Sequence, residues 1–195
     1  MDGAAPTESV RDRIELLDHL HLEGLSCAEI GVCSGTFSEE IYKRRPKRLY
    51  LVDPWNTKHR LPDKDEVKDG MSENGYLAVR LKFGRDPSVV IVRKTSFSAS
   101  LDMPDRTLDF VYIDANHYFR YAYADLLLWY PKLKKGGWLT GHDYNRDEWN
   151  VREAVDAFVK VSGERVGIVT GEPAGRNPNT CSGFWGNSFA IRKTR

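Results

Sequence analysis

Apolar and polar positions along the chain follow two alternating patterns. Short apolar runs predict buried β-strands at about 28–32, 49–52, 89–92, 108–113, 138–140, 166–169 and 188–191. Segments with apolar residues at helical spacing lie between most of them, at about 9–22, 37–45, 76–83, 118–130 and 151–159. Strands that alternate with helices form mostly parallel sheets covered on both faces. The sequence therefore predicts an α/β fold with a doubly wound, Rossmann-like sheet of seven strands.

The first and last segments of the chain differ from this alternating pattern. No helical segment separates the last two strands, so we expect an antiparallel strand at that edge. Near the N-terminus, Ser9 and Asp12 resemble a capping box at the start of the first amphipathic segment. We therefore expect an N-terminal helical segment within residues 1–24.

The length of 195 residues corresponds to one domain, covering residues 1–195. Two stretches, 54–75 and 171–187, are mostly without helical or strand periodicity. Loops of such length in compact domains are often lids or binding loops. We interpret 54–75 as a lid loop and 171–187 as a substrate loop.

Composition narrows the class of protein. The chain carries 29 Lys and Arg against 28 Asp and Glu, a formal net charge of +1, which argues against a general binder of nucleic acids or membrane surfaces. The cysteines Cys27, Cys33 and Cys181 lack the spacing of a disulfide framework or a zinc site. No apolar run reaches the ~18 residues of a membrane span, and the N-terminus does not resemble a secretion signal. We expect a cytoplasmic protein.

A glycine turn follows the first buried strand. In open α/β sheets ligands bind at the carboxyl ends of the strands, so this turn is a candidate ligand site. A dinucleotide pattern GxGxxG starting at Gly31 fails at Cys33 and Thr36. An acidic residue followed by GxGxG, the S-adenosylmethionine pattern, is matched by Glu29, Gly31 and Gly35 and departs at Cys33. The alternative is that both glycines only permit a tight turn.

Asp53 ends the second strand, 18 residues after Gly35. A carboxylate at this place can accept hydrogen bonds from both ribose hydroxyls, as in dinucleotide folds. Asp53 could also be a simple turn residue before Pro54. Together with the glycine turn, it favours a ribose-bearing ligand.

Longer segments carry a family resemblance. The runs AEIGVCSGTFSEEI, LYLVDPW and LDFVYIDANHYFRYAYADLLLWYPKLKKGGWLTGHDY resemble class I S-adenosylmethionine-dependent methyltransferases. More narrowly, they resemble methyltransferase family 24, which is related to macrocin-type sugar O-methyltransferases. The resemblance covers about residues 25–160. This chain departs from the family pattern at Cys33, at Asn116 in place of a second acidic residue, and at His142, where a carboxylate often stands.

The resemblance implies roles for individual residues around the cofactor S-adenosylmethionine. Glu29, Gly31 and Gly35 would hold its methionine part, and Asp53 its ribose. Ser96 would lie beside the adenine. Asp114 would lie next to the reacting sulfonium, where it could also hold a metal ion or a substrate hydroxyl.

Methyl transfer to a hydroxyl needs a group that takes the proton. His117 and His142 follow predicted strands, and an unperturbed imidazole has a pKa of about 6.5. Asp114 and Asp143 end adjacent strands and could share a divalent cation such as Mg²⁺. The alternatives are packed or exposed histidines, and carboxylates that serve a ribose, a turn or a helix start.

The residues after the fourth strand indicate the acceptor. Amino methyltransferases usually carry (D/N)PP(Y/F) there, whereas this chain has Asp114-Ala115-Asn116-His117. We therefore expect O-methylation of a small-molecule hydroxyl, of sugar or phenol type. An NAD-type or nucleotide-sugar enzyme and a non-catalytic S-adenosylmethionine-binding module remain alternatives. With no separate substrate domain, specificity would come from the two loops or from a second subunit of a homo-oligomer.

Overall fold

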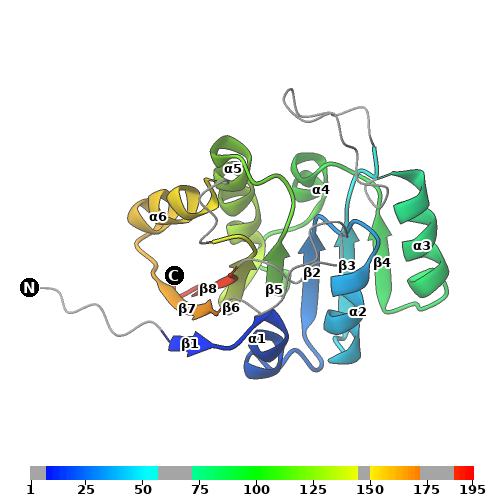
Figure 1. Cartoon of the computed structure of the whole chain (residues 1–195), viewed down its shortest axis with the longest axis horizontal. Helices are drawn as coiled ribbons and strands as arrows, with labels where there is room; N and C mark the ends of the chain where they lie inside the picture. The colour runs from blue at the N-terminus through cyan, green and yellow to red at the C-terminus, as the bar shows by residue number, and fades with distance from the viewer. Residues whose placement is uncertain (1–7, 57–71, 145–149, 172–186) are drawn as a thin grey trace, which may run out of the picture.

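The computed structural model describes residues 8–56, 72–144, 150–171 and 187–195. Its eight strands form one sheet in the order β1-β7-β8-β6-β5-β2-β3-β4 (Figure 1). They are β1 (Glu8–Val10), β2 (Ser26–Ile30), β3 (Arg48–Val52), β4 (Val89–Val92), β5 (Leu108–Ile113), β6 (Leu133–Gly141), β7 (Val166–Thr170) and β8 (Phe189–Arg192). Only β8 runs against its neighbours, β6 and β7. The α/β fold with a mostly parallel sheet is confirmed.

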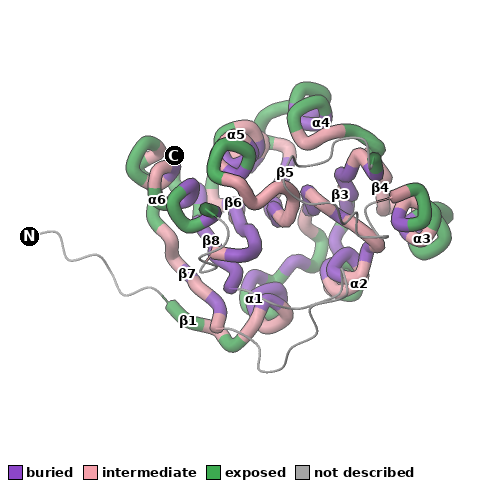
Figure 2. The backbone as a smooth tube through the Cα atoms, turned by 45° about the horizontal axis from the view of Figure 1, so that its top comes forward, coloured by how far each residue is buried: buried purple, intermediate pink, exposed green. Residues whose placement is uncertain are grey.

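Two layers of helices cover this sheet (Figure 1). They are α1 (Arg13–His19), α2 (Thr36–Lys43), α3 (Glu73–Phe83), α4 (Ser96–Asp102), α5 (Phe119–Trp129) and α6 (Val151–Ser162), with a 3₁₀ turn at Tyr130–Lys132. One apolar cluster packs α4, α5 and α6 against the sheet, and a second packs α1, α2 and α3 against the opposite face. Figure 2 shows the central strands buried between helices whose outer sides are exposed. None of the described helices is both long and apolar enough to cross a membrane.

The N-terminal segment differs from the prediction. Residues 8–10 form β1, which pairs parallel with β7, so the helix does not begin at Ser9. Asp12 is itself the N-cap, because its carboxylate accepts hydrogen bonds from the backbone N–H groups of Ile14 and Glu15. The sheet consequently has eight strands instead of seven. The last two strands do pair antiparallel, but β1 lies outside them at the edge.

Two further elements differ in extent. The short helix α4 follows β4 and was not predicted, because its sequence SFSASLD shows no amphipathic pattern long enough to notice. β6 begins five residues before the predicted strand, at Leu133, with an irregular register against β5 near Phe110. Most of the predicted lid loop (57–71) and substrate loop (172–186) lies outside the described residues.

The strand order places the candidate site. From β2 the chain proceeds to β3 and β4 on one side, and then continues with β5 on the other side of β2. The switch point therefore lies at the carboxyl ends of β2 and β5, where open α/β sheets bind ligands. The glycine turn and Asp114 follow these two strands directly.

Candidate functional site

The glycine turn is held against the end of β5. Gly31 has φ of +93°, and a Cβ at this position would overlap the backbone carbonyl of Asp114. Gly35, the N-cap of α2, has φ of +77°, and a Cβ there would lie 3.0 Å from a methyl group of Val79. Both positions therefore need glycine for reasons of backbone geometry and space. Cys33 adopts the left-handed region as well, with φ of +54°.

Asp53 is tied to this turn by its side chain. One carboxylate oxygen accepts hydrogen bonds from the N–H groups of Val32 and Cys33, each at 3.0 Å, and the other accepts from Trp55 at 2.7 Å. Burial raises the pKa of Asp53, and these three hydrogen bonds oppose that shift. The indole N–H of Trp55 donates in turn to the carbonyl of Cys33 at 2.7 Å. Asp53, the residue predicted to bind the ribose, therefore lies at the turn and stabilises it.

Glu29 lies beneath the turn. Its carboxylate is buried and accepts a hydrogen bond from the hydroxyl of Ser38 on α2. Burial raises the pKa of Glu29 to about 8, with further repulsion from Asp114 and Asp53. The hydrogen bond from Ser38 therefore connects Glu29, at the end of β2, to α2.

Ser96 is the first residue of α4, and it faces α5. Its hydroxyl donates to the carboxylate of Asp125 and accepts from the indole N–H of Trp129 at 2.8 Å. Burial raises the pKa of Asp125 to about 6, which the hydrogen bond from Ser96 opposes. Ser96 thereby anchors the start of α4 at the carboxyl edge of the sheet.

The other four predicted residues converge at the ends of β5 and β6, which are parallel neighbours. His117 Nε2 lies 3.2 Å from an Asp114 oxygen and 3.1 Å from an Asp143 oxygen. His142 Nδ1 lies 3.3 Å from the other Asp143 oxygen and 3.7 Å from Asp114. Two carboxylates and two imidazoles therefore form one cluster.

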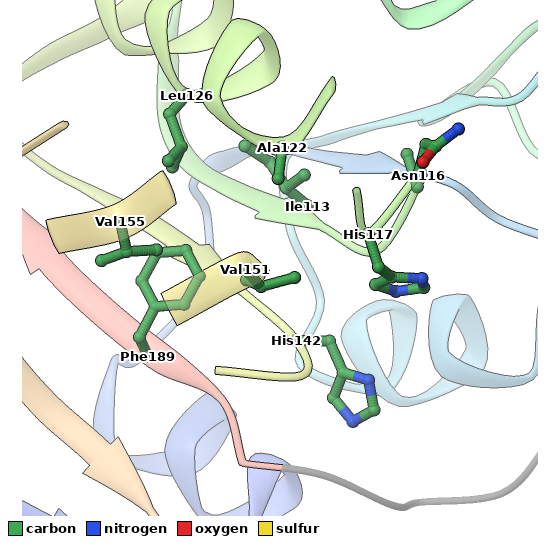
Figure 3. Close-up of a pocket in the computed structure, with 10 residues that line it drawn as sticks. Ile113, Asn116, His117, Ala122, Leu126, His142, Val151, Val155 and Phe189 are labelled. Carbon is green, nitrogen blue, oxygen red and sulfur yellow. The ribbon is translucent and has the colours of Figure 1, made fainter. Parts of the chain in front are cut away.

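The cluster borders a small pocket. Figure 3 shows His117 and His142 at one side of this pocket, with Asn116 pointing away from both histidines. Asn116 accepts a hydrogen bond from the backbone N–H of Tyr118, so it caps a local turn. The other walls are mostly apolar and consist of Ile113, Ala115, Ala122, Leu126, Val151, Val155 and Phe189.

Charges around Asp114 keep it ionised. Burial alone would raise the pKa of this carboxyl, but the nearby His142, His117 and Arg13 hold it well below its usual range. Arg13 was not predicted as a site residue. It lies 101 residues from Asp114 in the sequence, and no local motif marks it. Only the packing of α1 against the sheet brings the two together.

Three residues of the cluster fit a divalent cation. Asp114, His117 and Asp143 each offer one ligand atom, and these atoms lie within 4.8 Å of one another. The two aspartates are those predicted for the metal, and His117 is an addition. Nε2 of His142 is buried and has no hydrogen-bond partner among the described residues. The set combines oxygen and imidazole ligands, which many divalent metals accept.

A known protein family matches the segment that builds this site. The family model of a methyltransferase domain, that of methyltransferase family 24, matches residues 28–144. This segment is more than half of the chain and includes the glycine turn and the acid–histidine cluster. The chain belongs to methyltransferase family 24.

Solved methyltransferase structures share the fold. The O-methyltransferase NovP has a TM-score of 0.64 at 16% identity, covering 94% of this chain and 80% of NovP. The N-methyltransferase NodS from Bradyrhizobium japonicum WM9 has a TM-score of 0.63 at 14% identity, covering 94% and 95%. An S-adenosylmethionine-dependent methyltransferase from Mesorhizobium loti has a TM-score of 0.60 at 13% identity, covering 92% and 96%. None of the curated protein sequences matches the chain significantly.

These similarities decide the class of the protein. The chain is a methyltransferase that depends on S-adenosylmethionine, as the glycine turn and the segment after β5 predicted. The family assignment speaks against the alternatives of an NAD-type or nucleotide-sugar enzyme and of a non-catalytic binding module.

Proposed function

We propose that this methyltransferase 24 family member methylates a hydroxyl oxygen of a small molecule. The proposal is supported by one cluster of side chains beside the glycine turn, formed by Asp114, His117, His142 and Asp143. A weakly acidic hydroxyl needs help in losing its proton, whereas a neutral amine is already nucleophilic. A cluster of imidazoles and carboxylates supplies that help.

S-adenosylmethionine supplies an electrophilic methyl group on its sulfonium. Asp114 would orient the acceptor hydroxyl by accepting a hydrogen bond from it. An imidazole of the cluster would take the hydroxyl proton as the methyl group is transferred to the oxygen, and the cofactor would leave as a neutral thioether that keeps the electron pair of the broken sulfur–methyl bond.

The identity of the base depends on whether a cation is bound. In a metal-free site, His117 is the better base, since it contacts both Asp114 and Asp143. With Mg²⁺ or another divalent cation held by Asp114, His117 and Asp143, the metal would acidify the hydroxyl. His117 could then no longer take the proton, and His142 would be the base.

The pocket beside the two histidines favours one type of acceptor. The pocket itself, of about 20 Å³, is too small for an acceptor ring, but an acceptor placed against its apolar lining from β5, α5, α6 and β8 would be better a phenol than a sugar, whose hydroxyls would lose hydrogen bonds there. NovP is named an O-methyltransferase, which supports oxygen as the acceptor atom. NodS is named an N-methyltransferase, so an amine must be included in the test.

The experiment has a binding step and a transfer step. S-adenosylhomocysteine is first titrated calorimetrically into the protein, and labelled S-adenosylmethionine is then offered with matched phenols, sugars and amines. We expect methylation of phenols, lost in Asp114→Asn and kept in Asp105→Asn, an exposed aspartate before β5. Loss of turnover in EDTA would assign a required cation, and full turnover would exclude one. Methylation of amines alone would disprove the proposed acceptor, and binding without any product would indicate a binding module.

A further inference from the structure

The side chain of Arg13 lies in the candidate site although its helix begins far from the site in the sequence. Arg13 is the first residue of α1, and only 5% of its side chain is exposed. Its guanidinium lies over the ring of Phe37, 4.4 Å from the centroid, and Nη1 lies 3.4 Å from an Asp114 oxygen. Charged side chains are rarely so buried unless they are paired, and Arg13 is paired with Asp114.

The helix itself gives no reason for a cation at this position. The N-terminus of a helix carries partial positive charge, so an arginine there is electrostatically unfavourable. The first turn of α1 is already capped by Asp12 and carries the acidic Glu15. The position of Arg13 is therefore explained better by what its guanidinium faces than by the stability of α1.

The guanidinium faces the place where the amino-acid end of the cofactor is expected. Phe37 is the second residue of α2, directly after the glycine turn, and Asp114 packs against Gly31 of the same turn. Of the lysine and arginine side chains in the described ranges, Arg13 is the one that forms an ion pair with an acid of the cluster. Asp114 and Glu29 are acidic groups that interact with it, and the hydroxyl of Tyr112 accepts a hydrogen bond from it as well.

The charges of the ligand match this arrangement. The methionine end of S-adenosylmethionine carries an ammonium group, a carboxylate and the sulfonium. Acidic side chains such as Asp114 suit the two cationic groups, but they repel the carboxylate. A guanidinium has a planar fork of N–H donors that can bind a carboxylate through two parallel hydrogen bonds.

We propose that Arg13 binds the carboxylate of the methionine part of S-adenosylmethionine, so that α1 forms part of the cofactor site. This inference rests on the cofactor assignment that also underlies the proposed function. It adds a binding residue that lies outside the matched family segment of residues 28–144. Arg13 would bridge the bound carboxylate and Asp114.

The test removes the interacting group from each partner in turn. Wild type and Arg13→Gln are titrated calorimetrically with S-adenosylhomocysteine and with its decarboxylated analogue, which keeps the amine. We expect Arg13→Gln to lower the affinity for S-adenosylhomocysteine at least about tenfold, the usual effect of losing a charge-assisted hydrogen bond. Its affinity for the decarboxylated analogue should change by less than about twofold, since the carboxylate is already missing. Arg13→Lys, which keeps the charge but loses the fork, should give an intermediate loss.

Arg44→Gln is the matched control for the packing of α1. Arg44, the C-cap of α2, also contacts this helix, because it binds Asp18 at 2.8 Å and the carbonyl of Ile14 at 3.2 Å. If Arg13 acted only by holding α1 in place, Arg44→Gln would lower the affinity for S-adenosylhomocysteine and for its decarboxylated analogue, as Arg13→Gln would. Equal losses for the two ligands in Arg13→Gln, or no loss for S-adenosylhomocysteine, would overturn the inference.

The outcomes also separate this inference from the proposed function. Folded wild type that binds no S-adenosylhomocysteine would overturn the cofactor assignment and the role of Arg13 together. Carboxylate-specific loss in Arg13→Gln without methylation of any phenol would keep Arg13 as a cofactor ligand and reject the proposed acceptor. Phenol methylation with unchanged S-adenosylhomocysteine binding by Arg13→Gln would keep the proposed acceptor and reject Arg13 as a cofactor ligand.

Discussion

The carboxylate of Asp53 accepts a hydrogen bond from the backbone N–H of Cys33 at 3.0 Å. The residue expected to bind the ribose therefore also fixes the turn that is expected to hold the methionine part. A carboxylate offers about four lone-pair sites, so it can serve three backbone N–H groups and still accept from a ribose hydroxyl. The two roles are compatible, and they couple cofactor binding to the shape of the turn.

Removal of the Asp53 carboxylate should destabilise the fold as well as the complex. Asp53→Ala leaves the buried N–H groups of Val32, Cys33 and Trp55 without their acceptor, which should lower the free energy of unfolding by about 1–3 kcal/mol. Urea denaturation of the ligand-free protein measures this loss. The exposed Asp105→Ala should leave the midpoint unchanged. An unaltered midpoint in Asp53→Ala would show that these hydrogen bonds do not stabilise the turn.

The backbone of the turn predicts opposite effects at two neighbouring positions. Cys33 has φ of +54°, which glycine adopts without strain, so Cys33→Gly should raise the free energy of unfolding by up to about 1 kcal/mol. Gly31→Ala should prevent folding or lower stability severely, because the new methyl group would overlap the carbonyl of Asp114. Thermal and urea denaturation compare both variants with wild type. A destabilised Cys33→Gly would mean that the cysteine side chain itself supports the turn.

Burial of Glu29 predicts a pH dependence of stability. Burial raises its pKa from 4.5 to about 8 in the folded protein, so the folded state holds a proton that the unfolded state releases. The resulting stabilisation is complete below pH 4.5 and is lost as the pH rises through about 8. Glu29→Gln, which mimics the protonated form, should flatten the decline in unfolding free energy between these pH values.

Urea titrations at a series of pH values measure the effect of Glu29→Gln. The exposed Glu23→Gln is the control, since its side chain pairs only with Arg45 at the surface among the ion pairs of the described residues. A decline of equal steepness in wild type and Glu29→Gln would assign the pH dependence to other groups.

The fold could be predicted from the sequence where burial leaves a clear pattern. β2, β3 and β5 are buried on both faces, so each is an apolar run that the sequence displays. β1 has only three residues, and Val10 coincides with helical spacing toward α1, so the strand was mistaken for part of a helix. Its pairing with β7 depends on residues about 160 positions away, which no local pattern records.

The candidate site was predicted to a similar extent. Asp114 and Asp143 follow parallel strands, so their proximity could be inferred from topology, and the structure brings His117 and His142 to both. The inward position of Arg13 could not be inferred, because it depends on how α1 packs against β5. The hydrogen bond from Ser38 to Glu29 could not be predicted either, since nothing in the turn sequence indicates which way Glu29 points.

The ligand set of the cluster predicts which cation it prefers. Imidazole nitrogen favours Co²⁺ and similar transition metals, whereas Mg²⁺ prefers an all-oxygen set. With His117 beside Asp114 and Asp143, Co²⁺ should bind at least about tenfold more tightly than Mg²⁺. His117→Asp replaces the nitrogen with oxygen and should narrow or reverse this preference.

The visible absorption of Co²⁺ follows its binding and its displacement by Mg²⁺, independently of turnover. His19→Asp, a partly exposed histidine on α1, should not change the titration. Displacement of Co²⁺ by equimolar Mg²⁺ in wild type, or failure of Co²⁺ to bind, would reject this ligand set.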